Sequence, residues 1–283
     1  MNKKLNVIIM VAIIVVSSFC ITTIGVKDKC EATIVSYSDD ILYSATAVQS
    51  IDSETINYNR KEIISYKINE SFPDYYNTNT SINNTCANVA GANIIGFYDR
   101  YYDDLIPNYT TGIQRANGYT YYPMTLNADK KQSVINILYN TMETNTKSDG
   151  TSKDDCIKGL RNYVQVQGRS INYTSVMANG LFNLDKFDNE LRNGNPVMFF
   201  LSGYNFVSIT DTGSQAIIDK SIYMGNHIVV AYGYQKINYY NTNNNLVKSN
   251  TYIEVSTGIK NVKGYYLLNN GGNMDAAEAV TIN

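Results

Sequence analysis

The sequence predicts an α+β fold in which helices come first and strands follow. Apolar residues recur at three- and four-residue intervals in residues 86–101, 129–143 and 152–167, which is the spacing of amphipathic helices. From Val197 onward the pattern changes to short apolar runs bounded by turn residues, which is typical of strands. This order favours an N-terminal helical half and a C-terminal antiparallel sheet.

The first helix has clear local signals at both ends. Asn84 or Thr85 can cap its start, and Pro107 lies just beyond its end. Its predicted inner face begins with small residues and ends with tyrosines, so we expect another backbone to approach closely near the start. The predicted strands are residues 197–202, 204–210, 221–234, 251–257 and 265–270.

The N-terminus has the layout of a secretory signal. Lys3 and Lys4 precede an almost uncharged apolar run over residues 5–26. We expect residues 1–26 to be a signal peptide or an uncleaved membrane anchor, and the rest of the chain to be extracellular or at the cell surface. Residues 27–74 read as an N-terminal extension, a propeptide or edge strands of the main domain, which covers residues 75–283.

Composition excludes several functions. The formal net charge is −2 and the isoelectric point is near 5.5, so no basic field is present for nucleic acid. Membrane contact is expected only through the N-terminal segment. The cysteine spacing contains neither CxxC nor Cys/His pairs, so we expect no metal and no other cofactor. Most of the 25 tyrosines are attributed to composition rather than to carbohydrate or peptide binding.

Cys86 is the candidate nucleophile because it lies at the predicted start of the first helix. The N–H groups and the dipole of a helix N-terminus stabilise a thiolate. The alternative is that Cys86 is a small buried hydrophobic residue, as cysteines without a disulfide often are. Cys156, on the third predicted helix, is interpreted as a core residue.

His227 is the only histidine in the chain and therefore the only routine proton acceptor near neutral pH. It lies in the predicted strand over residues 221–234, where it alternates with Gly225, Val229 and Ala231. The alternative is an ordinary core histidine. A third group should orient the imidazole, and Asn269 or Asn270 in the last predicted strand is suited to that role.

Four blocks of the sequence resemble a known family. The stretch NNTCANVAGANIIGFYDRYYDDLIP is similar to the nucleophile helix of papain-like cysteine peptidases, and closest to secreted relatives of the bacteriocin-processing (double-glycine leader) peptidases. GNHIVVAYGY resembles the histidine strand of that group, YYLLNNGGN its Asn strand, and LRNGNPVMFFL the strand entry before the histidine. The resemblance covers roughly residues 75 to 275 in the order Cys, His, Asn.

The resemblance implies a papain-like fold and a cysteine peptidase that hydrolyses peptide or protein substrates through a thioester. Cys86 would be the nucleophile, His227 the general base and then acid, and Asn269 the orienting residue, with Asn270 as the alternative. The family places a Gln oxyanion donor about six residues before the cysteine, where this chain has Thr80.

Side chains that would replace this Gln are Asn79, Asn83 and Asn84. The missing Gln also motivates the rival interpretation, a non-catalytic papain-like module that binds peptides, cell-wall material or a surface partner. Hydrolysis and acyl transfer remain open alternatives, as does the oligomeric state.

Overall fold

The computed structural model describes residues 42–43, 48–68, 72–109, 114–116, 119–121, 128–260, 263–268 and 272–283. Residues 1–26, interpreted above as a signal or anchor, lie outside this part, as do Asn269 and Asn270. Within the described part, no helix has the length and apolar composition to cross a membrane.

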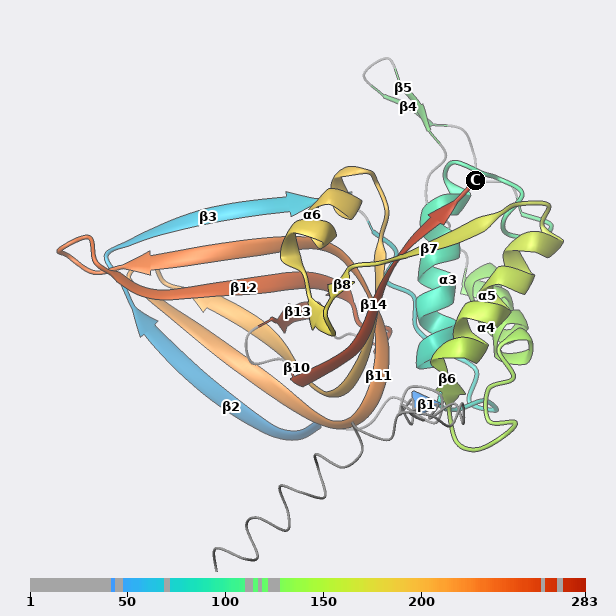
Figure 1. Ribbon diagram of the computed structural model, residues 1–283, viewed down its shortest axis with the longest axis horizontal. Helices are drawn as coiled ribbons and strands as arrows, with labels where there is room; N and C mark the ends of the chain where they lie inside the picture. The colour runs from blue at the N-terminus through green and yellow to red at the C-terminus, as the bar shows by residue number, and fades with distance from the viewer. Residues whose placement is uncertain are drawn as a thin grey trace, which may run out of the picture. The chain divides into compact units, whose positions relative to one another are not determined.

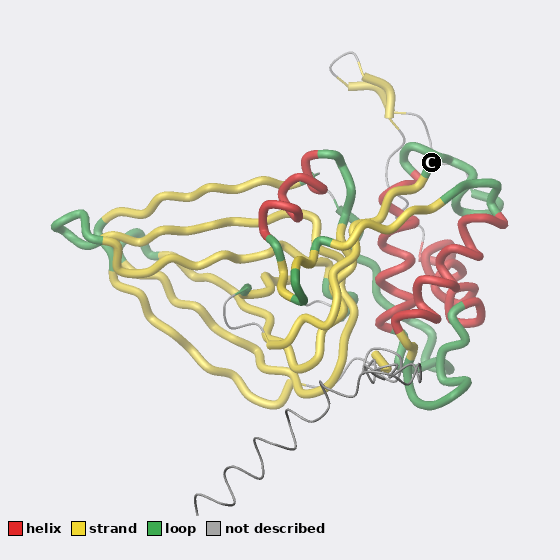
Figure 2. Tube along the Cα trace, in the orientation of Figure 1, coloured by secondary structure: helices red, strands yellow, loops and turns green. Residues whose placement is uncertain are grey.

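One large antiparallel sheet dominates the described structure (Figure 2). Its strand order is β2–β11–β12–β13–β10–β14–β7, with bounds Val48–Asn57, Gln215–Tyr240, Leu246–Ser256, Lys263–Leu267, Val197–Asp211, Gly272–Ile282 and Ile171–Ser175. The long strand β11 also pairs with β3 (Arg60–Lys67) and directly with β10. Because β11 contacts both β12 and β10, strands β10 to β13 close into a small barrel.

Helices pack against one face of the sheet, on the right of the view in Figure 1. These are α3 (Cys86–Asp99), α4 (Ala128–Thr141) and α5 (Lys153–Val166), while α6 (Leu184–Arg192) packs on the other face with the second apolar cluster. Short two-stranded sheets are formed by β1 (Leu42–Tyr43) with β6 (Thr151–Ser152), β4 (Gln114–Ala116) with β5 (Tyr119–Tyr121), and β8 (Met177–Ala178) with β9 (Leu181–Phe182).

The expected fold class is wrong. The predicted papain-like α+β arrangement, with a helical N-terminal half carrying the Cys helix and a C-terminal sheet carrying His and Asn, is not what the chain forms. It is mainly antiparallel sheet with a small barrel and four described helices. Strands β2 and β3 precede the Cys helix and pair with β11, so residues before α3 contribute to the same sheet as the C-terminal strands.

The reason for this error lies in the edge strands. In β3, six of the eight residues are exposed, and Ile63 and Ile64 are about half exposed, so no apolar face identifies it as a strand. Residues 48–67 are therefore edge strands of the main sheet, which is one of the three roles left open for residues 27–74.

The helix that carries Cys86 is the centre of the helical layer. All fourteen residues of α3 are buried, because the sheet covers one side and α4 and α5 cover the other. This surrounding is typical of a helix that is apolar on all sides. Two buried amides on α3 make hydrogen bonds: Asn88 Nδ2 donates to Thr144 Oγ1 at 2.9 Å, and Asn93 Oδ1 accepts from the Tyr75 N–H at 2.8 Å.

Candidate functional site

Cys86 is the first residue of α3, as the sequence predicted. Thr85 occupies the N-cap position, but its side chain makes no capping hydrogen bond. By contrast, the caps of α5 and α6, Ser152 and Asn183, accept from Asp155 N and Lys186 N. The first N–H groups of α3 therefore lack a side-chain acceptor from the cap, which is the arrangement that stabilises an anion at this end.

Cys86 is buried in the apolar cluster that also contains Tyr43 and Cys156. Cys86 is 4% exposed. Burial raises the pKa of the Tyr43 hydroxyl, and the charges of Asp275, Cys156 and Cys86 raise it further, so these four residues share one neighbourhood. Burial likewise raises the pKa of the Cys156 thiol, with a second contribution from Cys86. Both thiols are therefore poorly solvated. Poor solvation disfavours the charged thiolate, and for Cys86 the helix N-terminus acts in the opposite direction.

A carboxylate connects this neighbourhood to the surface. Tyr43 Oη donates to Asp275 Oδ2 at 3.1 Å, and Ser202 Oγ donates to Asp275 Oδ1 at 2.8 Å. Asp275 is exposed, whereas Tyr43 is only 1% exposed. Sequence analysis did not select these residues, because they come from three separate strands whose pairing no local pattern reveals.

His227 lies in β11, as predicted, but its ring points to the other face of the sheet. Its neighbours Ile228 and Val230 belong to the apolar cluster that includes α3, whereas Val229 and Ala231 belong to the second cluster. Because side chains alternate along a strand, His227 shares the face of Val229 and Ala231. The residue of this segment that faces α3 is Asn226.

The ring of His227 is 1% exposed and packs between aromatic residues. It stacks on Tyr204 with centroids 5.0 Å apart, and it meets Phe206 at 6.1 Å. Nε2 lies 2.8 Å from the carbonyl oxygen of Thr257, and Nδ1 has no hydrogen-bond partner in the described part of the chain. Burial lowers the pKa of His227 to about 4, and the bond to Thr257 offsets part of that effect.

One segment lies between the His227 ring and the first turn of α3. Gly258 follows Thr257, whose carbonyl holds the imidazole. A Cβ atom added at Gly258 would lie 3.0 Å from Cγ1 of Val89, one turn after Cys86. The backbone of Thr257 and Gly258 therefore lies between the two residues of the predicted Cys–His pair. Thr257 contacts the His227 ring, and Gly258 contacts the first turn of the helix that begins at Cys86.

The three candidate oxyanion residues lie in the loop before Cys86, and two of them use their amides elsewhere. Asn79 Nδ2 donates to Asn136 Oδ1 at 3.3 Å, and Asn84 Nδ2 donates to Asn145 Oδ1 at 3.0 Å. Asn83 is exposed and accepts from Asn145 through its side-chain oxygen at 2.7 Å. Of the three, Asn83 is the one whose amide nitrogen is not engaged by another described side chain.

Known proteins do not add a family to this description. No protein-family model, no curated protein and no solved structure matches the chain. Within the described residues, no group of three or more His, Cys, Asp or Glu side chains is arranged to hold a metal ion.

Proposed function

We propose that the protein is a thiol hydrolase that cleaves peptide bonds with Cys86 as its nucleophile and His227 as its proton acceptor. The observation that carries the proposal is the position of Cys86 as the first residue of a helix without a side-chain cap. A thiolate formed there is stabilised by the helix dipole. The secretory layout of residues 1–26 supports an activity outside the cell.

The protonation state of His227 supports its role. A carbonyl oxygen can only accept, so Nε2 carries the proton and donates to Thr257. Nδ1 then holds a lone pair, which is the form that a general base needs. In the reaction, the thiol proton passes to Nδ1, the sulfur attacks the peptide carbonyl, and the imidazolium returns the proton to the leaving amine. Water then hydrolyses the thioester.

The reaction requires His227 on the α3 face of the sheet. Gly225 precedes it with a φ of +114°, and the facing Gly203 has a φ of +64°, next to a register irregularity between β10 and β11. A one-residue change of register turns every side chain of a strand to the opposite face. Residues 228–231 are apolar on both faces, so within this segment the change exchanges apolar for apolar side chains.

The test compares the two buried cysteines. Iodoacetamide labelling followed by mass spectrometry, and hydrolysis of a casein digest, are measured for the full chain, Cys86→Ala and Cys156→Ala. We expect Cys86→Ala to abolish hydrolysis and thiol labelling at the helix start, while Cys156→Ala retains both. Thermal unfolding of each variant verifies folding. A wild-type chain that is inert to iodoacetamide and as inactive as Cys86→Ala would overturn the proposal.

A second function is favoured by the burial of both groups. Cys86 is 4% exposed, His227 is 1% exposed, and the His227 pKa of about 4 makes it a weak base at neutral pH. A non-catalytic module that binds peptides or surface partners needs neither residue to react. For such a module, His227→Ala leaves ligand binding unchanged, and a peptide aldehyde or epoxide forms no adduct with Cys86.

A further inference from the structure

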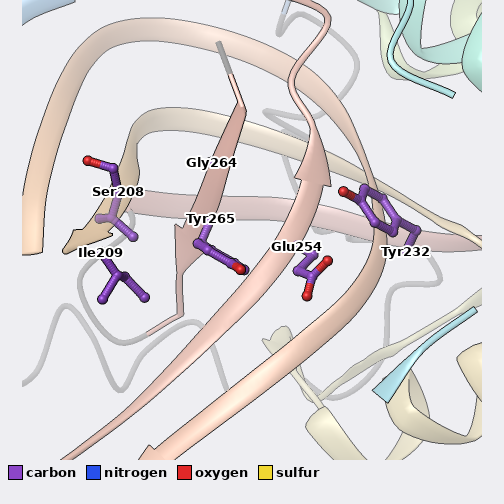
Figure 3. A pocket seen from close by; sticks show the side chains of 7 residues that line it. Ser208, Ile209, Tyr232, Glu254, Gly264 and Tyr265 are labelled. Carbon is purple, nitrogen blue, oxygen red and sulfur yellow. The ribbon is translucent and has the colours of Figure 1, made fainter. Parts of the chain in front are cut away.

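A cavity of about 350 Å³ opens among the strands of the barrel, and Cys86 is not among the residues that line it (Figure 3). Its walls come from four strands, with Ser208 and Ile209 on β10, Tyr232 on β11, Glu254 on β12 and Tyr265 on β13. In Figure 3 the side chains of Tyr265 and Glu254 lie next to each other at the centre. The volume is at the small end of the range for ligand pockets, about 300 to 1,000 Å³, so it suits a ligand of one ring.

The charge in this cavity is already balanced. Glu254 is 6% exposed, and its Oε2 lies 2.6 Å from Nζ of Lys67 on β3. Its Oε1 accepts a hydrogen bond of 3.3 Å from Gln235 Nε2. Since the buried carboxylate and the ammonium neutralise each other, neither a cationic nor an anionic ligand finds an unbalanced charge here.

The cavity still offers polar groups that suit hydroxyl groups of a ligand. Gln235 Nε2 donates to Tyr265 Oη at 3.0 Å, so the hydroxyl proton of Tyr265 points elsewhere and finds no acceptor within the described part of the chain. A carboxylate has about four lone-pair positions, and Glu254 uses two of them for Lys67 and Gln235. Ser208 adds an exposed hydroxyl at the edge.

Flat and apolar surfaces complete the walls. Tyr232 is held by Phe72, whose ring stacks on it with centroids 4.7 Å apart and planes 4° apart. Ile209 supplies an aliphatic surface. A ligand that fits this cavity therefore has apolar ring faces, several hydroxyl groups at its edge and no charge.

From this balance of charge, hydrogen-bonding groups and aromatic walls, we propose that the barrel cavity binds a neutral saccharide unit. This binding is independent of the thiol hydrolase. It gives a ligand-binding function to Tyr232 and Tyr265, although most of the tyrosines were attributed to overall composition from the sequence. The carboxylate of Glu254 accepts from sugar hydroxyls, the hydroxyl of Tyr265 donates to one, and the ion pair with Lys67 holds the carboxylate in position.

The experiment titrates the full chain with glucose and N-acetylglucosamine, followed by NMR chemical shifts and by calorimetry. Sodium acetate and methylammonium chloride serve as charged probes. We expect saturable shifts with at least one sugar, centred on Tyr232 and Tyr265, and none with either charged probe. No saturable binding of either sugar, or saturable binding of a charged probe in their place, would overturn the proposal.

Matched variants separate the cavity from the rest of the surface. Tyr265→Phe keeps the ring and removes the donor, so we expect sugar binding to weaken about 2- to 12-fold, the range of one hydrogen bond. Tyr240→Phe makes the same change at a half-buried position outside the cavity and should leave binding unchanged. Equal affinity in both variants would contradict the assignment of the donor. If Tyr265→Phe does not fold, the site is tested by the wild-type titration. Chemical shifts that change with sugar at Tyr232 and Tyr265 support the cavity, and changes confined to other residues contradict it.

Discussion

The imidazole of His227 and the backbone carbonyl of Thr257 lie 2.8 Å apart, 30 residues from each other along the chain. This bond fixes the tautomer, because the carbonyl accepts the Nε2 proton and leaves Nδ1 unprotonated. Since His227 is the only histidine, its protonation can be measured without ambiguity.

We expect the NMR titration of His227 to give a pKa of about 4, well below the ordinary 6.5, because burial disfavours the charged ring. The unfolded chain takes up this proton near pH 6.5 and the folded chain only near pH 4. The contribution of His227 to the free energy of unfolding, taken as the difference between the wild type and a His227 variant, should therefore fall by about 3 kcal/mol as the pH falls through this window. His227→Gln should remove this acid sensitivity.

The same titration tests the register change that the hydrolase requires. If His227 moves to the α3 face and pairs with the Cys86 thiolate, the opposite charge raises its pKa. We expect a peptide aldehyde that reacts with Cys86 to shift the His227 resonances, and iodoacetamide to do so less. A pKa near or above the ordinary value in the unliganded chain would contradict the buried position of the ring.

Asp99, at the C-terminal end of α3, gives a pH dependence of the opposite sign. It is 1% exposed, and within the described residues no side chain donates to its carboxylate. Burial raises its pKa to about 7, the N–H of Ile106 offsets part of this, and the charges of Asp103 and Asp104 add to it. The folded state thus holds the proton to higher pH than the unfolded state, so the contribution of Asp99 to the free energy of unfolding falls as the pH rises from about 4 to 7.

Replacement by the neutral amide should remove this dependence. We expect Asp99→Asn to exceed the wild type in stability at about pH 8, by up to about 4 kcal/mol, and to lose that advantage at about pH 4. Urea unfolding at both values measures the difference, and the effect of His227 cancels because it is common to both proteins. Asp103→Asn, at an exposed neighbouring position, is the control. An advantage of Asp99→Asn that does not depend on pH would exclude protonation as its cause.

The side-chain amide of Asn145 makes several of the hydrogen bonds that hold the loop before Cys86. Its Nδ2 donates to Asn83 Oδ1 at 2.7 Å and to Tyr139 Oη at 2.9 Å, while its Oδ1 accepts from Gly150 N at 2.6 Å and from Asn84 Nδ2 at 3.0 Å. We expect Asn145→Gly to lower the free energy of unfolding by about 2 kcal/mol through the loss of these bonds.

The backbone conformation of Asn145 allows two causes of lost stability to be separated, the loss of side-chain hydrogen bonds and backbone strain. Its φ is +60°, a conformation that costs alanine roughly 1 to 2 kcal/mol more than glycine. Asn145→Ala should therefore be less stable than Asn145→Gly by about that amount in urea unfolding. Asn189→Ala, on the exposed side of α6, should change stability little. Equal losses for the alanine and glycine variants would show that the left-handed backbone relaxes.

Helix periodicity predicted the helical layer well. The predicted helices over residues 86–101, 129–143 and 152–167 are α3, α4 and α5 to within two residues at each end, and Cys156 is fully buried as predicted. Strand β14 was missed because its sequence, GNMDAAEAVTI, is rich in Ala and contains Glu, residues that are uncommon in strands. It forms a strand because it pairs with β10 on one side and β7 on the other.

The candidate site was harder to predict, for a geometric reason. Alternation along β11 showed which residues share a face with His227, but not which face meets α3, because both faces of residues 228–231 are apolar. Tyr43 and Asp275 join the surroundings of Cys86 through a contact between residues 232 positions apart. No local pattern carries that information.

A backbone approach closer than that of Gly258 to Val89 near the start of α3 lies at Gly159 on α5. A Cβ atom at Gly159 would lie 2.6 Å from both N and Cα of Met142, whereas one at Gly91 would meet only the side-chain ends of Leu138 and Met142, at 3.0 Å. Backbone atoms cannot move aside as side-chain ends can.

We expect Gly159→Ala to destabilise the protein by about 1 to 3 kcal/mol, the usual effect of overpacking. Gly91→Ala should be nearly neutral, because the helix propensity of alanine offsets a mild repacking. Thermal and urea unfolding of the two variants measure the difference, and a Gly159→Ala protein as stable as Gly91→Ala would show that α4 and α5 do not approach this closely.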